Sequence, residues 1–184
     1  MSDLNELIGI LTVECVKENR EEAFDNVINA IEAFYKDNFF LEDYEVAIFL
    51  TNTEKTVLSF ACPKYLVNSG MIPITSTEAY SASIYRNARG LIENNLQQQK
   101  HLGIFEIIRT PDDHVKLLWK MMGTVIAVGQ EKFGVIEISR RSVSQMDAGE
   151  DFNEGDLRFL EDTIKKIAPY LKQVLPENFR GKIT

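Results

Sequence analysis

The side chains best suited to acid–base or metal chemistry gather in one short run, Asp-Asp-His at residues 112–114. Two carboxylates beside an imidazole are typical metal ligands and typical acid–base groups. Thr110 and Pro111 precede the run, and a Thr-Pro step followed by acidic residues is typical of a helix N-terminus, where carboxylates stabilise unpaired amides. We therefore interpret the run as the start of a short helix toward Trp119, and assign no catalytic residue and no metal to the chain.

The other reactive groups lack the spacing that known sites need. His101 and His114 are the only histidines, and neither has a Cys or His at ligand spacing. Cys15 and Cys62 lie in apolar or amphipathic surroundings, which is typical of inert thiols in a reducing compartment. Residues 151–162 begin like a calcium loop, but the glycine stands one place too early. The sequence contains no phosphate-binding glycine loop and no serine-hydrolase elbow.

Hydrophobic periodicity predicts the elements that would position any site. Asn19 with Glu22 is a capping signal that predicts either two N-terminal helices or one long helix that bends near it. Thr75 with Glu78 predicts a capping box for a later helix. The expected elements, in order, are helical stripes at 4–15 and 24–34, strands at 45–50 and 56–61, a loop at 64–73, a helix from 75 to 90, a short strand at 91–94, and a mixed helical or irregular stretch through 108.

The most regular part of the chain is residues 119–171. Residues 121–128 and 133–139 are two apolar segments joined by a glycine-containing turn, which predicts a β-hairpin. Neither strand alternates cleanly between apolar and polar residues, so both faces of the sheet are expected to be covered. After an acidic loop, Asn153 and Asp156 form a capping-box signal, and apolar residues follow at spacings of three and four. Such a stripe predicts a helix that pairs with another helix.

This segment, GTVIAVGQEKFGVIEISRR followed by DFNEGDLRFLEDTIKKIAPYL, resembles the C-terminal half of a GAF domain. The family pattern there is a hairpin with a terminal Gly, branched apolar residues and a Ser-Arg-basic step, then a Phe before a helix opened by Asp-Leu. Residues 43–63 resemble the first hairpin of the family, and residues 76–95 its first crossover helix and next strand. The resemblance implies an α+β fold, in which an antiparallel sheet carries the N- and C-terminal helices on one face. The crossover segments of residues 73–119 would form a pocket on the other.

The middle region mixes apolar side chains with polar ones, as a ligand pocket with a few orienting groups does, and as an irregular surface also does. The candidate ligand-binding residues are Tyr80, Ser81, Tyr85, Asn94, Asn95, His101 and Phe105. The residue sets of the resembled enzymes and cofactor-binding domains are absent. Free methionine sulfoxide reductases of GAF type use several cysteines, bilin-binding GAF domains use a Cys followed by His, and phosphodiesterase-like regulators carry Asn-Lys-Phe-Asp-Glu. The cofactor is therefore unknown.

The terminal helices carry more apolar surface than one sheet face is expected to cover, which predicts a homodimer. The predicted interface residues are Leu4, Leu7, Leu11, Leu157, Leu160, Ile164 and Ile167. This gives a dimerising N-terminal helix at residues 1–18, a GAF-like domain at 19–176 and a tail at 177–184.

Composition limits the partners. The 184 residues carry a formal net charge of -8, which disfavours binding to nucleic acid. No apolar run is long enough to span a bilayer and no secretory signal is present, so we expect a cytoplasmic protein without a membrane partner. The predicted function is a small-molecule-sensing regulatory module that dimerises and signals to a separate protein. The alternative is a ligand-free interaction module, and a redox enzyme of GAF type is third.

Overall fold

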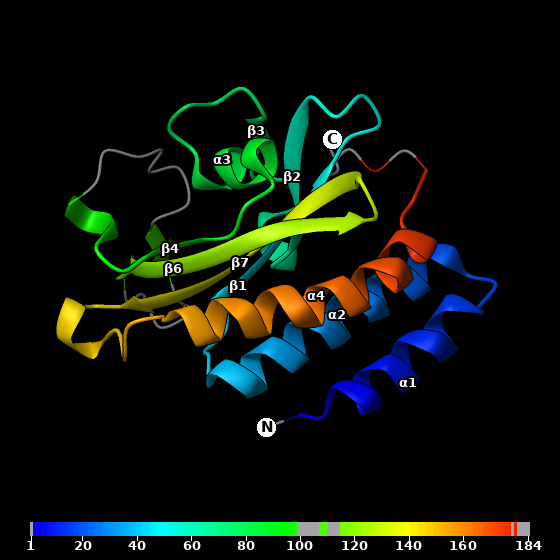
Figure 1. The fold of residues 1–184 in the computed structure, drawn as a ribbon, viewed down its shortest axis with the longest axis horizontal. Coiled ribbons are helices and arrows are strands. Elements are labelled where there is room, and N and C mark those ends of the chain that lie inside the picture. The colour runs from blue at the N-terminus through cyan, green and yellow to red at the C-terminus, as the bar shows by residue number, and fades with distance from the viewer. Residues whose placement is uncertain (1, 99–106, 110–114, 178, 180–184) are drawn as a thin grey trace.

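The computed structural model describes residues 2–98, 107–109, 115–177 and 179, and it contains one sheet with helices on both faces (Figure 1). The helices are α1 (Leu4–Cys15), α2 (Arg20–Phe39), α3 (Tyr80–Asn87) and α4 (Glu154–Val174), with short 3₁₀ turns at Lys64–Leu66, Leu96–Gln98 and Gln145–Asp147. The strands are β1 (Val46–Thr51), β2 (Val57–Cys62), β3 (Met71–Pro73), β4 (Leu91–Glu93), β5 (Ile107–Arg109), β6 (Val115–Val128) and β7 (Glu131–Ser142).

Every strand pair in the described sheet is antiparallel. The order is β3-β2-β1-β7-β6-β4, and β5 pairs with the first residues of β6. The predicted hairpin of β6 and β7 is confirmed, with Gly129 at φ 61° in a two-residue turn that pairs Val128 with Glu131. A positive φ at this position is one that glycine adopts without strain, so the turn sets the register of the longest pairing in the sheet.

The predicted short helix toward Trp119 is wrong for the part of it that the structure describes. Residues 115–119 belong to β6, where Leu117 pairs with Ile107 of β5 and with Ser142 of β7. Pairing with strands on both sides outweighs a local helix-start signal, because each ladder satisfies backbone groups that a lone helical turn would leave exposed. Residues 110–114, which carry that signal, lie outside the described residues.

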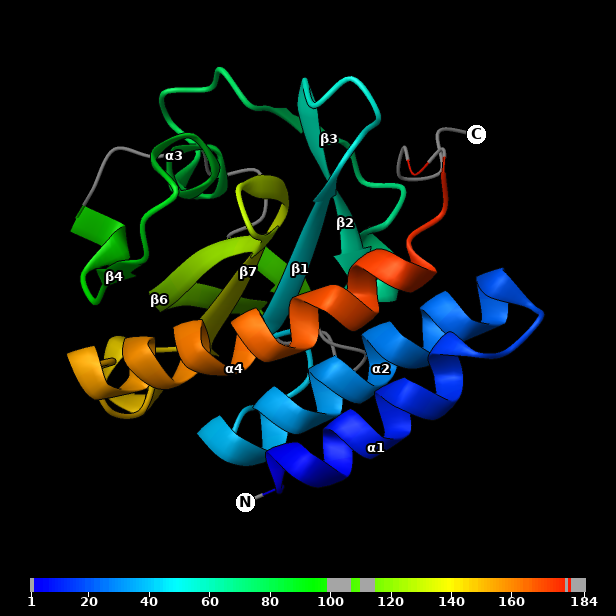
Figure 2. The ribbon, with the colours of Figure 1, turned by 45° about the vertical axis from the view of Figure 1, so that its right-hand side comes forward.

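Three helices form a layer on one face of the sheet, and α3 lies on the other (Figures 1 and 2). Helices α2 and α4 contact the sheet, and α1 packs against both of them. The capping predictions for α2 and α4 are confirmed. The Asn19 side chain accepts a hydrogen bond from the backbone N of Glu22 at 3.2 Å, and Asn153 and Asp156 form a reciprocal capping box. The predicted α+β arrangement, with the terminal helices on one face, is therefore confirmed.

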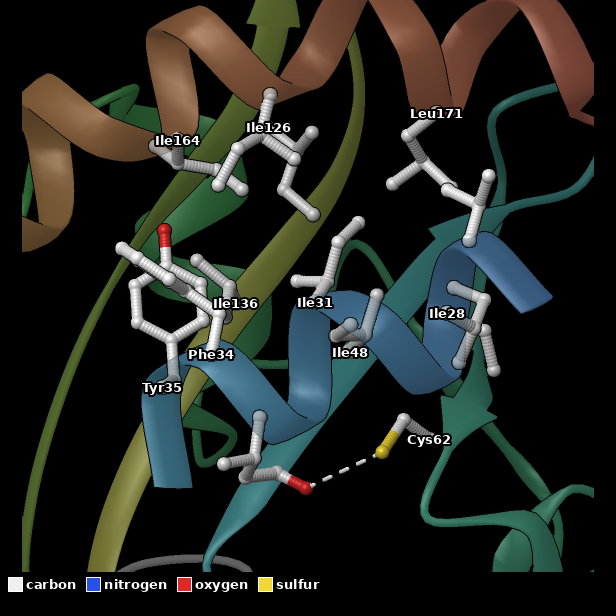
Figure 3. Packing of buried hydrophobic residues seen from close by; sticks show 14 of the residues in the cluster. Ile28, Ile31, Phe34, Tyr35, Ile48, Cys62, Ile126, Ile136, Ile164 and Leu171 are labelled. Atoms are coloured by element: carbon white, nitrogen blue, oxygen red, sulfur yellow. Dashed lines mark hydrogen bonds between the residues drawn. The ribbon is translucent and has the colours of Figure 1, made fainter. Parts of the chain in front are cut away.

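Strand alternation divides the interior into two cores, as expected for a sheet covered on both faces. In β1, Val46, Ile48 and Leu50 face the helices, whereas Ala47 and Phe49 face α3. Figure 3 shows the helix-side core, where Ile28, Ile31, Tyr35, Ile164 and Leu171 of α2 and α4 meet Ile48, Ile126 and Ile136 of the sheet.

Six of the seven residues predicted to form a dimer seam lie in this helix-side core or at its margin, and Leu157 is buried outside it. Leu7, Leu11, Leu160, Ile164 and Ile167 are at most 4% exposed within one chain, Leu157 is 9% exposed, and Leu4 packs at its margin. The contacts among α1, α2, α4 and the sheet thus account for the apolar stripe inside a single chain. Dimerisation itself stays a prediction.

The helix on the opposite face starts later than predicted, and the Thr75–Glu78 capping box is absent. The Ser76 hydroxyl instead accepts hydrogen bonds from the backbone N of Glu78 at 3.4 Å and of Ala79 at 3.2 Å, and α3 begins at Tyr80. Ser readily forms such local bonds, which compete with helix formation. The helix ends where Ala88 adopts a left-handed conformation, two residues before Gly90.

Candidate functional site

A cavity of about 70 Å³ lies between the α3 side of the sheet and the segments that cover it. Its lining is mostly apolar and comes from five strands, α3 and four connecting segments. The lining residues are Tyr44, Ala47, Phe49, Phe60, Pro63, Leu66, Ile72, Ala79, Tyr80, Ser81, Leu96, Leu118, Met121, Glu137, Ser139 and Arg141. An engineered apolar cavity of about 150 Å³ holds one benzene molecule, so this cavity suits a compound of only a few heavy atoms.

Strand β7 contributes the polar groups. Successive side chains of a strand point to opposite faces, so Glu137, Ser139 and Arg141 share the cavity side, while Ile136 and Ile138 belong to the helix-side core. One central strand therefore contacts both the cavity and the layer of terminal helices.

Glu137 is a partly buried acidic residue of the site. Its carboxylate atom Oε1 is shielded from solvent and has no hydrogen-bond partner in the described part of the chain. Burial raises the pKa of Glu137 to about 7, and the Arg141 guanidinium opposes that rise through its positive charge. A buried carboxylate without a partner is costly, and native proteins mostly keep such groups where they have a function.

Gly123 provides the space for this arrangement. It pairs with Glu137 across the β6–β7 ladder. A Cβ atom at Gly123 would lie 2.9 Å from Cδ1 of Ile84 in α3, 2.9 Å from the carbonyl oxygen of Ile136 and 3.0 Å from Cγ of Glu137. The missing side chain therefore allows α3 to approach the sheet and the stem of Glu137 to lie across β6.

The other end of the polar row is held by Glu45, which is buried beside the start of β1. Its Oε1 accepts a hydrogen bond from the backbone N of Arg141 at 2.5 Å, and its carbonyl accepts from the backbone N of Ser139 at 2.7 Å and from the Ser139 hydroxyl at 3.2 Å. Burial raises the pKa of Glu45, and the hydrogen bonds from the backbone N of Arg141 and Glu42 oppose that rise. The Ser139 hydroxyl is thus already engaged.

Two of the predicted ligand-binding residues, Tyr80 and Ser81, line the cavity. Tyr85 does not line it. Its hydroxyl donates to the Lys132 carbonyl at 3.2 Å, and Lys132 Nζ donates back to the Tyr85 carbonyl at 2.7 Å and lies 4.9 Å from the centre of its ring. This reciprocal pair fastens the end of α3 to the β6–β7 hairpin, so the geometry assigns Tyr85 a structural position.

The predicted asparagines also lie outside the cavity lining. The Asn94 side chain donates to the Phe152 carbonyl at 2.9 Å and accepts from the Phe152 backbone N at 3.0 Å, which ties β4 to the loop before α4. Asn95 is exposed, and its backbone N donates to Glu93. His101 and Phe105 lie outside the described residues.

Sequence reasoning missed Glu137 and Arg141. The available signal was a charged residue between Ile136 and Ile138, in the middle of an apolar strand that has both faces covered. The side-chain type alone does not separate such a residue from one that points to solvent at a strand edge.

Both cysteines lie on the helix side of the sheet, away from the cavity lining. Cys62 Sγ donates to the Val46 carbonyl at 3.6 Å (Figure 3), and Cys15 Sγ donates to the Tyr170 carbonyl at 3.5 Å. Burial raises the pKa of both thiols. Neither thiol is placed to attack a compound bound in the cavity, because both face the helix-side core. The raised pKa also disfavours the thiolate, which is the reactive form.

The described residues contain no group of three or more His, Cys, Asp or Glu side chains arranged to hold a metal ion. None of their helices combines the length and apolar character needed to cross a bilayer.

Comparison with known proteins supports the fold through structure alone. No family model matches the sequence, and a sequence search of curated proteins finds no match. Among solved structures, the GAF domain of an Acinetobacter phosphoenolpyruvate-protein phosphotransferase aligns with a TM-score of 0.60 at 12% identity, over 94% of this chain and 95% of that one.

Other aligned structures come from different functional classes. A free methionine-R-sulfoxide reductase from Neisseria meningitidis, in complex with its substrate, aligns with a TM-score of 0.59 at 15% identity over 95% of this chain and 93% of that one. The GAF domain of a two-component sensor histidine kinase from Bacillus halodurans aligns with a TM-score of 0.52 at 18% identity, over 82% of this chain and 94% of that one. The chain therefore has a GAF-like fold, and the implied fold is confirmed. At these identities the likeness extends to the fold and no further.

Proposed function

We propose that this protein is a regulatory module that senses a small molecule in the cavity between the sheet and α3. The observation that carries the proposal is the buried, unpartnered Oε1 of Glu137 in an otherwise mostly apolar lining. An apolar pocket with a few convergent polar groups is the usual form of a small-molecule site. A GAF-like fold is consistent with a sensory role, since several of the aligned structures are domains of signalling proteins.

A thermal-shift screen tests this proposal. A compound at about a hundred times its dissociation constant adds roughly 2.7 kcal/mol to the free energy of unfolding, which raises the melting temperature by several degrees in a domain of this size. A hit in the cavity should lose its shift in Phe49→Ala or Ser81→Ala, and keep it in Asn94→Ala, which lies outside the lining. A screen of compounds with a few heavy atoms, such as small alcohols, amides, carboxylates, amines and amino acids, that gives no shift would contradict sensing.

We further propose that the module forms a homodimer and signals to a separate protein. Because the predicted seam residues are buried within the chain, the dimer would use the outward side of α1, where Ile10, Val13 and Val16 are 46%, 60% and 77% exposed. Light scattering should then give twice the chain mass of 21.0 kDa. Val13→Lys should restore the monomer, whereas Val143→Lys, at a 66% exposed position in another segment, should not. A monomer at all concentrations would contradict dimerisation.

The alternative is an interaction module whose cavity stays empty. It is favoured by the small volume of the cavity, which a slight shift of α3 would close. A redox enzyme ranks third, because the two cysteines lie in the helix-side core. Reductase activity that is abolished by Cys62→Ser would make a redox enzyme the favoured function.

A further inference from the structure

We propose that the cavity binds a short zwitterion, a small amino acid, with its ammonium group at Glu137 and its carboxylate toward Arg141. This inference rests on the proposed sensing function and specifies the ligand. It follows from the two opposite charges that line one small cavity.

The first argument is the missing partner of Glu137. Oε1 is shielded from solvent and accepts no hydrogen bond from any described residue. An ammonium group supplies both the missing donors and a compensating positive charge, and such charge-assisted hydrogen bonds are the strong ones. A hydroxyl or amide would supply a donor only.

The second argument is charge balance. Arg141 lines the same cavity and lies close enough for its positive charge to lower the pKa of Glu137. The Arg141 guanidinium has five N–H donors, so it can hold a ligand carboxylate beside the contacts that it already makes. A molecule that carries both charges can engage both Glu137 and Arg141, and its net charge of zero limits the cost of leaving water.

The third argument is the size of the cavity and the position of the two charged side chains along its wall. Four residues along a strand separate the two Cα atoms by roughly 13 Å, and both side chains line the same cavity. Ser139 stands between them with its hydroxyl engaged by Glu45, so the charged ends dominate recognition. Phe49, Phe60 and Met121 line the cavity and can contact a short hydrocarbon body. A volume of about 70 Å³ restricts that body to a few carbons.

Matched probes test the assignment by calorimetry and thermal shift. The zwitterions glycine, alanine, β-alanine and γ-aminobutyrate are compared with acetate, propionate and butyrate, which lack the amine, and with ethylamine, propylamine and butylamine, which lack the carboxylate. We expect at least one zwitterion to bind and its two singly charged counterparts to bind about 10 to 100 times more weakly, as for loss of a hydrogen bond to a charged group.

Substitutions test which residue binds the ammonium end of the zwitterion and which binds the carboxylate end. Glu137→Gln should weaken binding of the zwitterion by a similar factor and should leave binding of the matched carboxylate unchanged or stronger. Arg141→Gln should weaken binding of the zwitterion but not binding of the matched amine. Glu150→Gln, which removes an exposed carboxylate elsewhere, should bind as the unchanged protein does. Circular dichroism confirms that each variant is folded.

Two results would overturn the inference, and they differ in what they leave standing. If another class of compound binds and competes for the cavity while every zwitterion fails, the ligand class is wrong and the sensing function stands. If neither these probes nor the wider screen shifts the melting temperature, the ligand class and the sensing function fail together.

Discussion

Replacing Glu137 by Gln should remove a pH-dependent loss of stability from the protein. Burial raises the pKa of Glu137 from the ordinary 4.5 to about 7 in the folded chain, so between these values the folded state holds a proton that the unfolded state has released. The free energy of unfolding must then fall as the pH rises from about 4.5 to about 7, and stay level above that. Each pKa unit is worth about 1.4 kcal/mol, which gives a loss of about 3 kcal/mol as an upper limit.

Urea denaturation followed by circular dichroism between about pH 4 and about pH 8 measures this effect. Other groups, among them the buried Glu45, also titrate in this range, so the informative quantity is the difference between the variant and the unchanged protein. That difference should grow by about 2–3 kcal/mol in favour of Glu137→Gln as the pH rises, and Glu150→Gln should show no such growth. A difference that stays constant with pH, or shrinks, would refute the assignment of Glu137 as a buried, uncompensated carboxylate.

Two further substitutions and a labelling experiment test the packing around the site and the core. Tyr35→Phe removes the buried hydrogen bond of 2.9 Å to the Thr163 hydroxyl, and should lower the free energy of unfolding by about 1 kcal/mol in urea denaturation. Gly123→Ala places a Cβ 2.9 Å from the Ile136 carbonyl, and should lower the free energy of unfolding by about 1–3 kcal/mol in the same assay. Cys62 should react with thiol reagents only as fast as the protein unfolds, because burial raises its pKa; rapid labelling of the native protein would contradict this.

Much of the fold could be predicted from the sequence because its signals are local. The α2 and α4 caps, the Gly129 turn and the strands around residues 46–62 each depend on neighbours a few positions apart. The start of α3 and the first part of β6 could not be predicted in this way. The former depends on which amides the Ser76 hydroxyl engages, and the latter on two strands that pair with residues 115–119.

The site was harder to predict, because a polar side chain reveals its role only through its partner. Asn94 and Tyr85 resemble ligand-orienting groups in the sequence, but their partners are Phe152 and Lys132, 58 and 47 residues away. Glu137 resembles an exposed strand residue, yet its Oε1 is buried without a partner. Tyr80 and Ser81 line the cavity because they lie on α3, one of the covering elements that the sequence placed near the pocket.

The position of β7 gives the site a direct mechanical connection to the terminal helices. Glu137 lines the cavity, while its neighbours Ile136 and Ile138 pack into the helix-side core against α2 and α4. Close-packed cores transmit small displacements because they have little free volume. A ligand that neutralises Glu137 and draws it toward the cavity would therefore act on Ile136 and Ile138 through one backbone segment. The layer of terminal helices is thus a single strand away from the cavity, and both cysteines, Cys15 of α1 and Cys62 of β2, pack in the helix-side core.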